Sequence, residues 1–386
     1  MTTLDTCLEE RRIAVIVGPG GVGKTTTAAA LAMEAARRGR NVLVLTVDPA
    51  RRLMDSLGLQ GAATTPTRVP PSAFASAEIS LGSGALYAMM LDVQQTFDAV
   101  VHRHAPSELV RKRIMDNPFY AEASTSLAGS QEYMAMEALY ALDQTDEFDL
   151  IVLDTPPTAH ALDFITAPDR LTEFLQAGSF KLVLSGFARA SRLGLGLFQF
   201  DNALVEVMNR FIGAEVFFKL VDFVDAFQEM YEGFQARAHK VTSMLRSEDT
   251  AFAIVSSTRS VAMREGLYLY ERLSSLDLKV EAFIANRVIE RDPPEVSLER
   301  LQAALLQAGQ APEAALEIAR GAALAVDRAR AASLVDRGRL EIMERSLAPG
   351  GPPVLTVPRY ERDICDLRGL ATYGERIVTA PGRRLA

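Results

Sequence analysis

The chain has 386 residues, 48% of them hydrophobic, which suits one large α/β domain with an insertion or two domains. Its formal net charge of −8 argues against a general nucleic-acid surface, because contact with phosphate backbones requires clustered Lys and Arg. The two cysteines, Cys7 and Cys365, provide no disulfide framework and no zinc-type spacing, so a reducing, cytoplasmic location is expected.

The N-terminal segment 1–12 is polar and lacks the apolar core of a secretion signal. No uninterrupted apolar run approaches the ~18 residues that a membrane-spanning helix needs. We therefore expect no transmembrane segment.

Short, nearly continuous apolar runs with many β-branched residues recur along the chain and are bounded by turn signals. They lie at 13–17, 42–47, 150–155, 252–256 and 280–286, with weaker examples at 86–91 and 353–358. Such runs, separated by helical sequence, predict a parallel sheet covered on both faces. The expected fold class is α/β, with a doubly wound, mostly parallel sheet.

Helix-like sequence is in excess between these strands, and we predict an inserted helical subdomain at about 92–148 and 159–245. Eleven of the 18 phenylalanines fall between Phe174 and Phe234. This Phe- and Met-rich segment either lines a groove for a hydrophobic helical client or simply packs as core. Residues 296–348 predict two amphipathic helices, which end before the break at 346–353.

The segment Gly18–Thr25 matches the pattern G-x-x-x-x-G-K-[ST] between a strand and a helix. Glycines let the backbone amides wrap around phosphates, and the helix N-terminus adds its positive end. Lys24 is expected to reach the β and γ phosphates, and the Thr25 hydroxyl to ligate Mg²⁺.

Two acidic residues at strand ends extend this site. Asp154 closes the apolar run 150–155, where a carboxylate can hold magnesium through water. Asp48 follows the run 42–47, at the edge where open α/β sheets bind ligands, and could orient the attacking water.

Together these motifs resemble the ArsA family, which includes the arsenite-pump ATPase and the ATPase that delivers tail-anchored membrane proteins. The wider deviant-Walker class also contains MinD and ParA. The resemblance is carried by the phosphate loop "GPGGVGKTT", by "DPARRLMDSLG" (48–58) as switch I and by "DTPPTAHALDFI" (154–165) as switch II. It extends to "FIANRV" (283–288) and "VPRYERDI" (357–364), and the order of the motifs agrees over nearly the whole chain.

The resemblance implies a single ATPase domain over residues 1–386, with C-terminal helices and an adenine loop at 296–370. It also implies a dimer that binds ATP and Mg²⁺ and whose closure rearranges the helical subdomains. Asp48 and Lys24 would be the catalytic residues, and Thr25 and Asp154 would hold the metal. The residues that would bind the nucleotide are Gly20, Gly21, Val22, Gly23, Lys24, Thr25, Thr26, Asn286, Val357 and Pro358.

Two departures from the family pattern stand out. Pro19 occupies the position where a lysine usually follows the first glycine and reaches the partner's phosphates. Hydrolysis is therefore expected to be slow, to use another basic residue such as Arg51 or Arg52, or to depend on a lysine from a different subunit. For Arg51 and Arg52, a solvated turn is the favoured interpretation. Cys7 and Cys365 can build neither a metalloid site nor a zinc clip, which disfavours arsenite transport.

The main hypothesis is an ATP-hydrolysing dimer, formed with itself or with a paralogue, that carries or regulates a client protein. An alternative is a nucleotide-dependent switch or scaffold with little turnover, which Pro19 favours. A third is a positioning ATPase on membrane or DNA, which the acidic charge and the absence of a C-terminal basic amphipathic helix disfavour.

Overall fold

The computed structural model describes residues 3–48, 52–61, 63–120, 130–156, 219, 222–223, 225–226, 229–289 and 297–383. Three predicted features lie outside the described residues. They are the part of switch II beyond residue 156, the side chain of Arg51, and the part of the Phe-rich segment between 174 and 218.

The core is an eight-stranded sheet in the order β3-β4-β2-β5-β1-β6-β7-β8. Every strand pair is parallel except β3 with β4, so the expected doubly wound sheet is confirmed. The strands are β1 (Ile13–Val17), β2 (Asn41–Thr46), β3 (Thr67–Arg68), β4 (Ala85–Met90), β5 (Leu150–Asp154), β6 (Thr250–Ser257), β7 (Val280–Val288) and β8 (Val354–Pro358).

All seven expected strands are present, whereas β3 was not foreseen. This strand has two residues and lies between Pro66 and Pro70, so it is too short to produce a hydrophobic period.

Helices cover both faces of the sheet because successive side chains of each buried strand point to opposite faces. In β1, Ala14 and Ile16 pack toward one layer, while Ile13, Val15 and Val17 pack toward the other. The first layer contains α1 (Thr3–Glu10), α2 (Lys24–Arg37), α3 (Arg52–Ser56), α4 (Pro71–Ser76) and α17 (Leu367–Thr379). The second contains α8 (Ser130–Asp143), α13 (Tyr231–Leu245), α14 (Ser260–Ser275) and the end of α16 (Pro312–Ser346).

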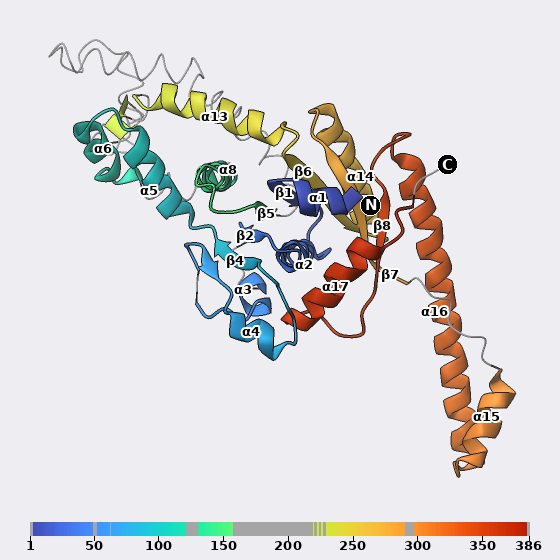
Figure 1. Ribbon diagram of the computed structural model, residues 1–386. Coiled ribbons are helices and arrows are strands. Elements are labelled where there is room, and N and C mark those ends of the chain that lie inside the picture. Colours follow the sequence, from blue (N-terminus) through green and yellow to red (C-terminus); the bar gives the residue numbers. More distant parts are fainter. Residues whose placement is uncertain are drawn as a thin grey trace, which may run out of the picture.

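A third apolar cluster forms away from the sheet, around α5 (Val93–His104) and α6 (Glu108–Met115), which Figure 1 shows at one end of the molecule. Side chains of α8 and residues near the start of α13 complete it, including Phe223 and Met230, which are buried there. The described part of 92–148 is thus largely helical, with a core of its own, and the subdomain boundaries stay a prediction.

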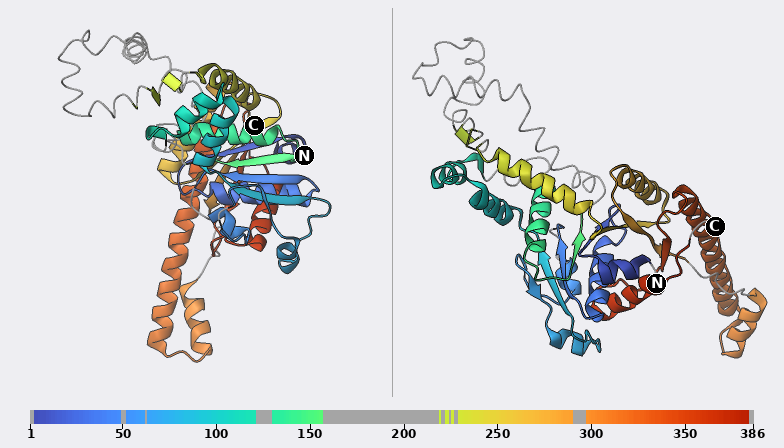
Figure 2. Two further views of the ribbon diagram at one scale, coloured as in Figure 1. Left: turned by 90° about the vertical axis from the view of Figure 1, so that its left-hand side faces the viewer. Right: turned by 45° about the horizontal axis from the view of Figure 1, so that its top comes forward.

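The expected pair of helices at 296–348 is confirmed as α15 (Leu298–Gln307) and α16, which has 35 residues. Figures 1 and 2 show this hairpin extending away from the sheet, with only the later part of α16 against it. Among the described helices, none combines the length and apolarity that crossing a bilayer requires.

Two helical glycines should respond in opposite ways to an added methyl group. A Cβ at Gly374 in α17 would lie 2.9 Å from the backbone oxygen of Ala30 in α2, whereas one at Gly321 in α16 would meet nothing within 4 Å. We expect Gly374→Ala to destabilise the protein by about 1–3 kcal/mol, and Gly321→Ala to stabilise it by about 0.5–1 kcal/mol. Urea unfolding followed by circular dichroism measures both, and an unchanged midpoint for Gly374→Ala would contradict the close α2–α17 packing.

Candidate functional site

The phosphate-loop motif occupies the turn between β1 and α2, at the carboxyl edge of the sheet. Gly18 has a φ of 153°, and a Cβ there would lie 2.0 Å from the carbonyl oxygen of Val255 in β6. Gly23 has a φ of 100°, and its Cβ would lie 2.5 Å from Nδ2 of Asn286. Both positions therefore require glycine for conformation and for space. Of the other expected loop residues, Gly20 and Gly21 are exposed, Val22 is buried and Thr26 is half-buried.

Lys24 is buried and crosses the loop, where its Nζ donates a hydrogen bond of 2.9 Å to the carbonyl oxygen of Pro19. Burial lowers the pKa of Lys24, and the nearby carboxylates of Asp154 and Asp48 oppose this shift. Pro19 thus contributes its carbonyl to the site, although its side chain carries no charge.

Asp154 ends β5 and is fully buried. Its Oδ2 accepts hydrogen bonds from the hydroxyl of Thr25, at 2.7 Å, and from that of Thr46, at 2.9 Å. Burial raises the pKa of Asp154 to about 6, while these two bonds and Lys24 act to lower it. The carboxylate is therefore held between the first turn of α2 and the end of β2.

The residues present fit a magnesium ion at this position. Oδ1 of Asp154 is buried and has no hydrogen-bond partner among the described residues. Beside it stands the Thr25 hydroxyl, and Mg²⁺ prefers oxygen ligands of these two kinds.

Asp48 is half-buried, just beyond the end of β2, and its backbone N–H donates to the Thr46 hydroxyl at 3.2 Å. Its charge contributes to the pKa shifts of both Lys24 and Asp154. The structure thus brings Lys24, Thr25, Asp48 and Asp154 together at one edge of the sheet.

Asn286 approaches the loop from β7 and is almost fully buried. Its Nδ2 donates a hydrogen bond of 2.8 Å to the carbonyl oxygen of Val22. On the neighbouring strand, the side chain of Val357 is buried in the core, whereas Pro358 is half-buried at the strand end. Any contact of Val357 with a ligand would therefore use its backbone.

Several residues at the site were missed by the sequence reasoning. Thr46 binds Asp154, and its signal was a lone hydroxyl in an apolar strand. Tyr373 is fully buried and shares a 2.9 Å hydrogen bond with the hydroxyl of Thr27, at the start of α2. Arg287 contacts the loop from β7. No local sequence pattern predicts the role of Tyr373, because its hydrogen-bond partner lies 346 residues away.

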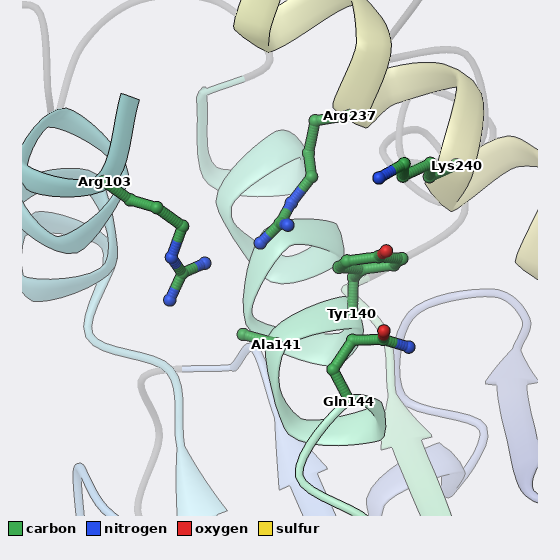
Figure 3. A pocket seen from close by; sticks show the side chains of 6 residues that line it. All are labelled: Arg103, Tyr140, Ala141, Gln144, Arg237 and Lys240. Carbon is green, nitrogen blue, oxygen red and sulfur yellow. The ribbon is translucent and has the colours of Figure 1, made fainter. Parts of the chain in front are cut away.

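Helix α8 connects this edge of the sheet to the helical part of the molecule. At its start, Nε2 of Gln131 donates to the carbonyl oxygen of Val47, beside Asp48, at 3.1 Å. Further along, the buried Glu137 pairs with Arg237 of α13 at 3.0 Å. Figure 3 shows Arg237 reaching between α5 and α8 toward Tyr140, whose ring centre is 4.3 Å from the guanidinium carbon.

The surface around this ion pair forms a pocket of about 390 Å³, which lies apart from the phosphate loop. Its lining residues are Arg103, Tyr140, Ala141, Gln144, Arg237 and Lys240. The nucleotide site expected at the loop is therefore separate from this pocket. Arg52, a basic residue considered as a replacement for the family's lysine, is exposed at the start of α3.

The chain is similar in sequence to known ATPases. The sequence profile of the family described as anion-transporting ATPase matches residues 11–308. The chain is 25% identical over 295 residues to ATPase GET3 of Malassezia globosa, covering 75% of this chain and 77% of that protein. It is 28% identical over 292 residues to ATPase ARSA2 of Chlamydomonas reinhardtii, covering 74% and 71%. It is 24% identical over 290 residues to ATPase get3 of Schizosaccharomyces japonicus, covering 74% and 78%.

Replacing the buried carboxylate should change how stability depends on pH. Because the pKa of Asp154 is raised from 3.8 to about 6, its protonated form favours the folded state below pH 3.8, and this stabilisation is lost as pH rises through about 6. The shift corresponds to roughly 3 kcal/mol. We expect Asp154→Asn to stabilise the metal-free protein near pH 8 and to reduce the difference between pH 5 and pH 8.

Urea midpoints of both proteins, measured in a chelator at these two pH values, check this expectation. The charged groups near the carboxylate are Lys24 and Asp48, and both remain in the variant. Parallel pH profiles for the two proteins would show that Asp154 does not titrate as its burial predicts.

Proposed function

The chain belongs to the anion-transporting ATPase family, the ArsA family, and from that premise we propose that it is a dimer driven by Mg-ATP whose nucleotide state opens and closes its helical subdomains. As a member of this family it binds ATP and is an ATP hydrolase. The residue roles, the magnesium ion, the dimer and the client are our proposals.

One observation carries the proposal most directly. Lys24, Thr25, Asp48 and Asp154 come from three separate segments, yet they meet where the phosphate loop leaves β1. A ligand site at the carboxyl ends of the strands, beside the strand where the connections change direction, is typical of doubly wound sheets. The expected phosphate cradle and the acidic residues that would serve it therefore occupy one place.

The reaction is phosphoryl transfer from ATP to water. Oxygen of the attacking water forms a bond to the γ-phosphorus, the bond from that phosphorus to the β–γ bridging oxygen breaks, and ADP leaves with the electron pair. Asp48 orients the water and accepts its proton. Lys24 exchanges the Pro19 carbonyl for phosphate oxygens and stabilises their charge, while the amides of residues 20–26 cradle the phosphates.

Magnesium would be held by the Thr25 hydroxyl and, through water, by Asp154. When bound, it supplies positive charge to the phosphate oxygens. The buried Oδ1 of Asp154, which has no partner among the described residues, supports this assignment.

Adenine would bind on the far side of the loop, between β7 and β8. Asn286 donates to the carbonyl of Val22 and also hydrogen-bonds Tyr373, so it would exchange one of these partners for the base. Pro358 would pack against the ring from the end of β8, together with the backbone of Val357.

Nucleotide state would reach the helical part through α8. Gln131 ties the start of this helix to the backbone beside Asp48, and the Glu137–Arg237 pair ties its middle to α13. A displacement of Asp48 on ATP binding would therefore move α8 and α13 together. Such movement would let the dimer carry or regulate a hydrophobic helical client.

The subunit arrangement is either a homodimer or a heterodimer with a paralogous ATPase. Pro19 favours the second arrangement, because it supplies no cation to a partner's phosphates. The same feature favours our second candidate function, a nucleotide switch or scaffold subunit with little turnover.

Cys7 and Cys365 are both free, which supports a reducing compartment such as the cytoplasm.

Steady-state phosphate release by the purified chain tests the enzyme against the switch. We expect wild-type protein to turn over repeatedly and Asp48→Asn to lower kcat by roughly 10²–10³-fold with ATP still bound, because the general base is lost. Lys24→Ala should weaken ATP binding itself. Arg272→Ala, at an exposed position on α14, is the matched control. Tight ATP binding without release by the wild type would establish the switch instead.

Sedimentation velocity tests the dimer. We expect Asp48→Asn with Mg-ATP to sediment as a dimer, because bound ATP is not consumed, and the dimer fraction to fall with ADP or without nucleotide. A monomer under all three conditions would contradict a homodimer. Co-purification of the Asp48→Asn protein with a paralogue of similar size would then identify the heterodimer, whereas a hydrophobic helical protein would identify a client.

A further inference from the structure

Strand β7 carries one extra residue next to the phosphate loop. In its pairing with β8, Ala285 lies opposite Thr356 and Val288 lies opposite Pro358, so Asn286 and Arg287 together face a single residue. This is a β-bulge, a feature that re-aims side chains near functional sites.

Arg287 adopts a left-handed backbone conformation, with a φ of 61°. A non-glycine residue rarely takes this conformation, because its Cβ crowds the neighbouring backbone. Such strain persists only where surrounding interactions compensate for it, and it is concentrated at ligand sites. We therefore expect the side chain of Arg287 to make an interaction that compensates for the backbone strain.

Both side chains of the bulge meet the phosphate loop at consecutive carbonyl groups. Asn286 donates to the carbonyl of Val22 at 2.8 Å, and Nη1 of Arg287 donates to the carbonyl of Gly21 at 3.4 Å. These bonds use carbonyl oxygens and leave the loop's N–H groups for phosphate.

The Gly21 end of the loop has little other support. Gly21 is exposed, has a φ of 72° and would meet nothing within 4 Å if it carried a Cβ. By contrast, the Val22–Gly23 end rests on the buried Asn286, and Thr27 in the first turn of α2 is bonded to Tyr373. Arg287 thus contacts the part of the loop that packing does not hold.

We propose that Arg287 is a positioning residue that braces the Gly21 end of the phosphate loop through the Gly21 carbonyl, in the shape that receives the diphosphate part of an adenine nucleotide. The inference rests on the proposed function and deepens it. Because the brace acts on the loop and not on the γ-phosphate, it sets the affinity for ATP and ADP alike and leaves the chemical step unchanged.

The test compares nucleotide affinity with turnover in three variants. Arg287→Ala should weaken Mg-ATP and Mg-ADP binding by the same factor, about fivefold, as expected for the loss of one modest hydrogen bond. In steady-state assays KM for ATP should rise in step, with kcat within about twofold of wild type. Arg287→Lys should restore most of the affinity, because an ammonium group also donates to a carbonyl.

Arg287→Gly separates the side chain from the backbone strain. Glycine accepts the left-handed conformation, so this variant should melt at or above the temperature of Arg287→Ala while binding nucleotide equally weakly. Arg272→Ala is the matched surface control and should change neither quantity.

Three results of the nucleotide assays would overturn the brace. The first is unchanged affinity of Arg287→Ala for both nucleotides. The second is loss of affinity for ATP but not for ADP, which would place the guanidinium on the γ-phosphate. The third is a fall in kcat at constant KM. Hydrogen–deuterium exchange of the amides of residues 20–23 in nucleotide-free protein gives an independent measurement. Arg287→Ala should accelerate it about fivefold, and equal exchange rates would also overturn the brace. If the wild type binds no nucleotide but Arg287→Ala still exchanges faster than the wild type, the proposed function is wrong and the contact of Arg287 with the loop is supported.

Discussion

The candidate site is organised around the buried carboxylate of Asp154 and the hydroxyl groups that donate hydrogen bonds to it. Asp154 receives hydroxyl hydrogen bonds from Thr25 and Thr46, which join the ends of β5 and β2 to the beginning of α2. Ionisation of a carboxyl group in this environment is costly, and the two hydroxyls and Lys24 offset only part of that cost. A cation at the same place would offset it further, which supports the proposed magnesium site.

The phosphate loop is supported from its carbonyl side by a different set of residues. Lys24 holds the Pro19 carbonyl, and Asn286 and Arg287 hold those of Val22 and Gly21. A short, glycine-rich turn has little stiffness of its own, because glycine is free to adopt many backbone conformations. Part of its shape is thus set by strands β6 and β7, which lie beyond the loop's own strand–loop–helix unit.

The parts of the site that were predictable from sequence are those encoded within a few residues. The turn from β1 into α2 has a local pattern, and Asp48 and Asp154 follow apolar runs, so the rule that parallel strands end at one edge placed them beside the loop. The bulge at Arg287 was not predictable in this way, because it depends on the register between β7 and β8. The Thr27–Tyr373 contact joins helices that only the folded sheet brings together, and no spacing along the chain encodes it.

The hydrogen bond between Thr27 and Tyr373 also orders events during synthesis of the chain. Helix α17 packs against α2, directly behind the phosphate loop, and it follows all eight strands of the sheet in chain order. Strand β8, which fixes the register of β7, emerges only shortly before it. A nascent chain therefore lacks this backing of its expected nucleotide cradle until all eight strands of the described sheet have been made.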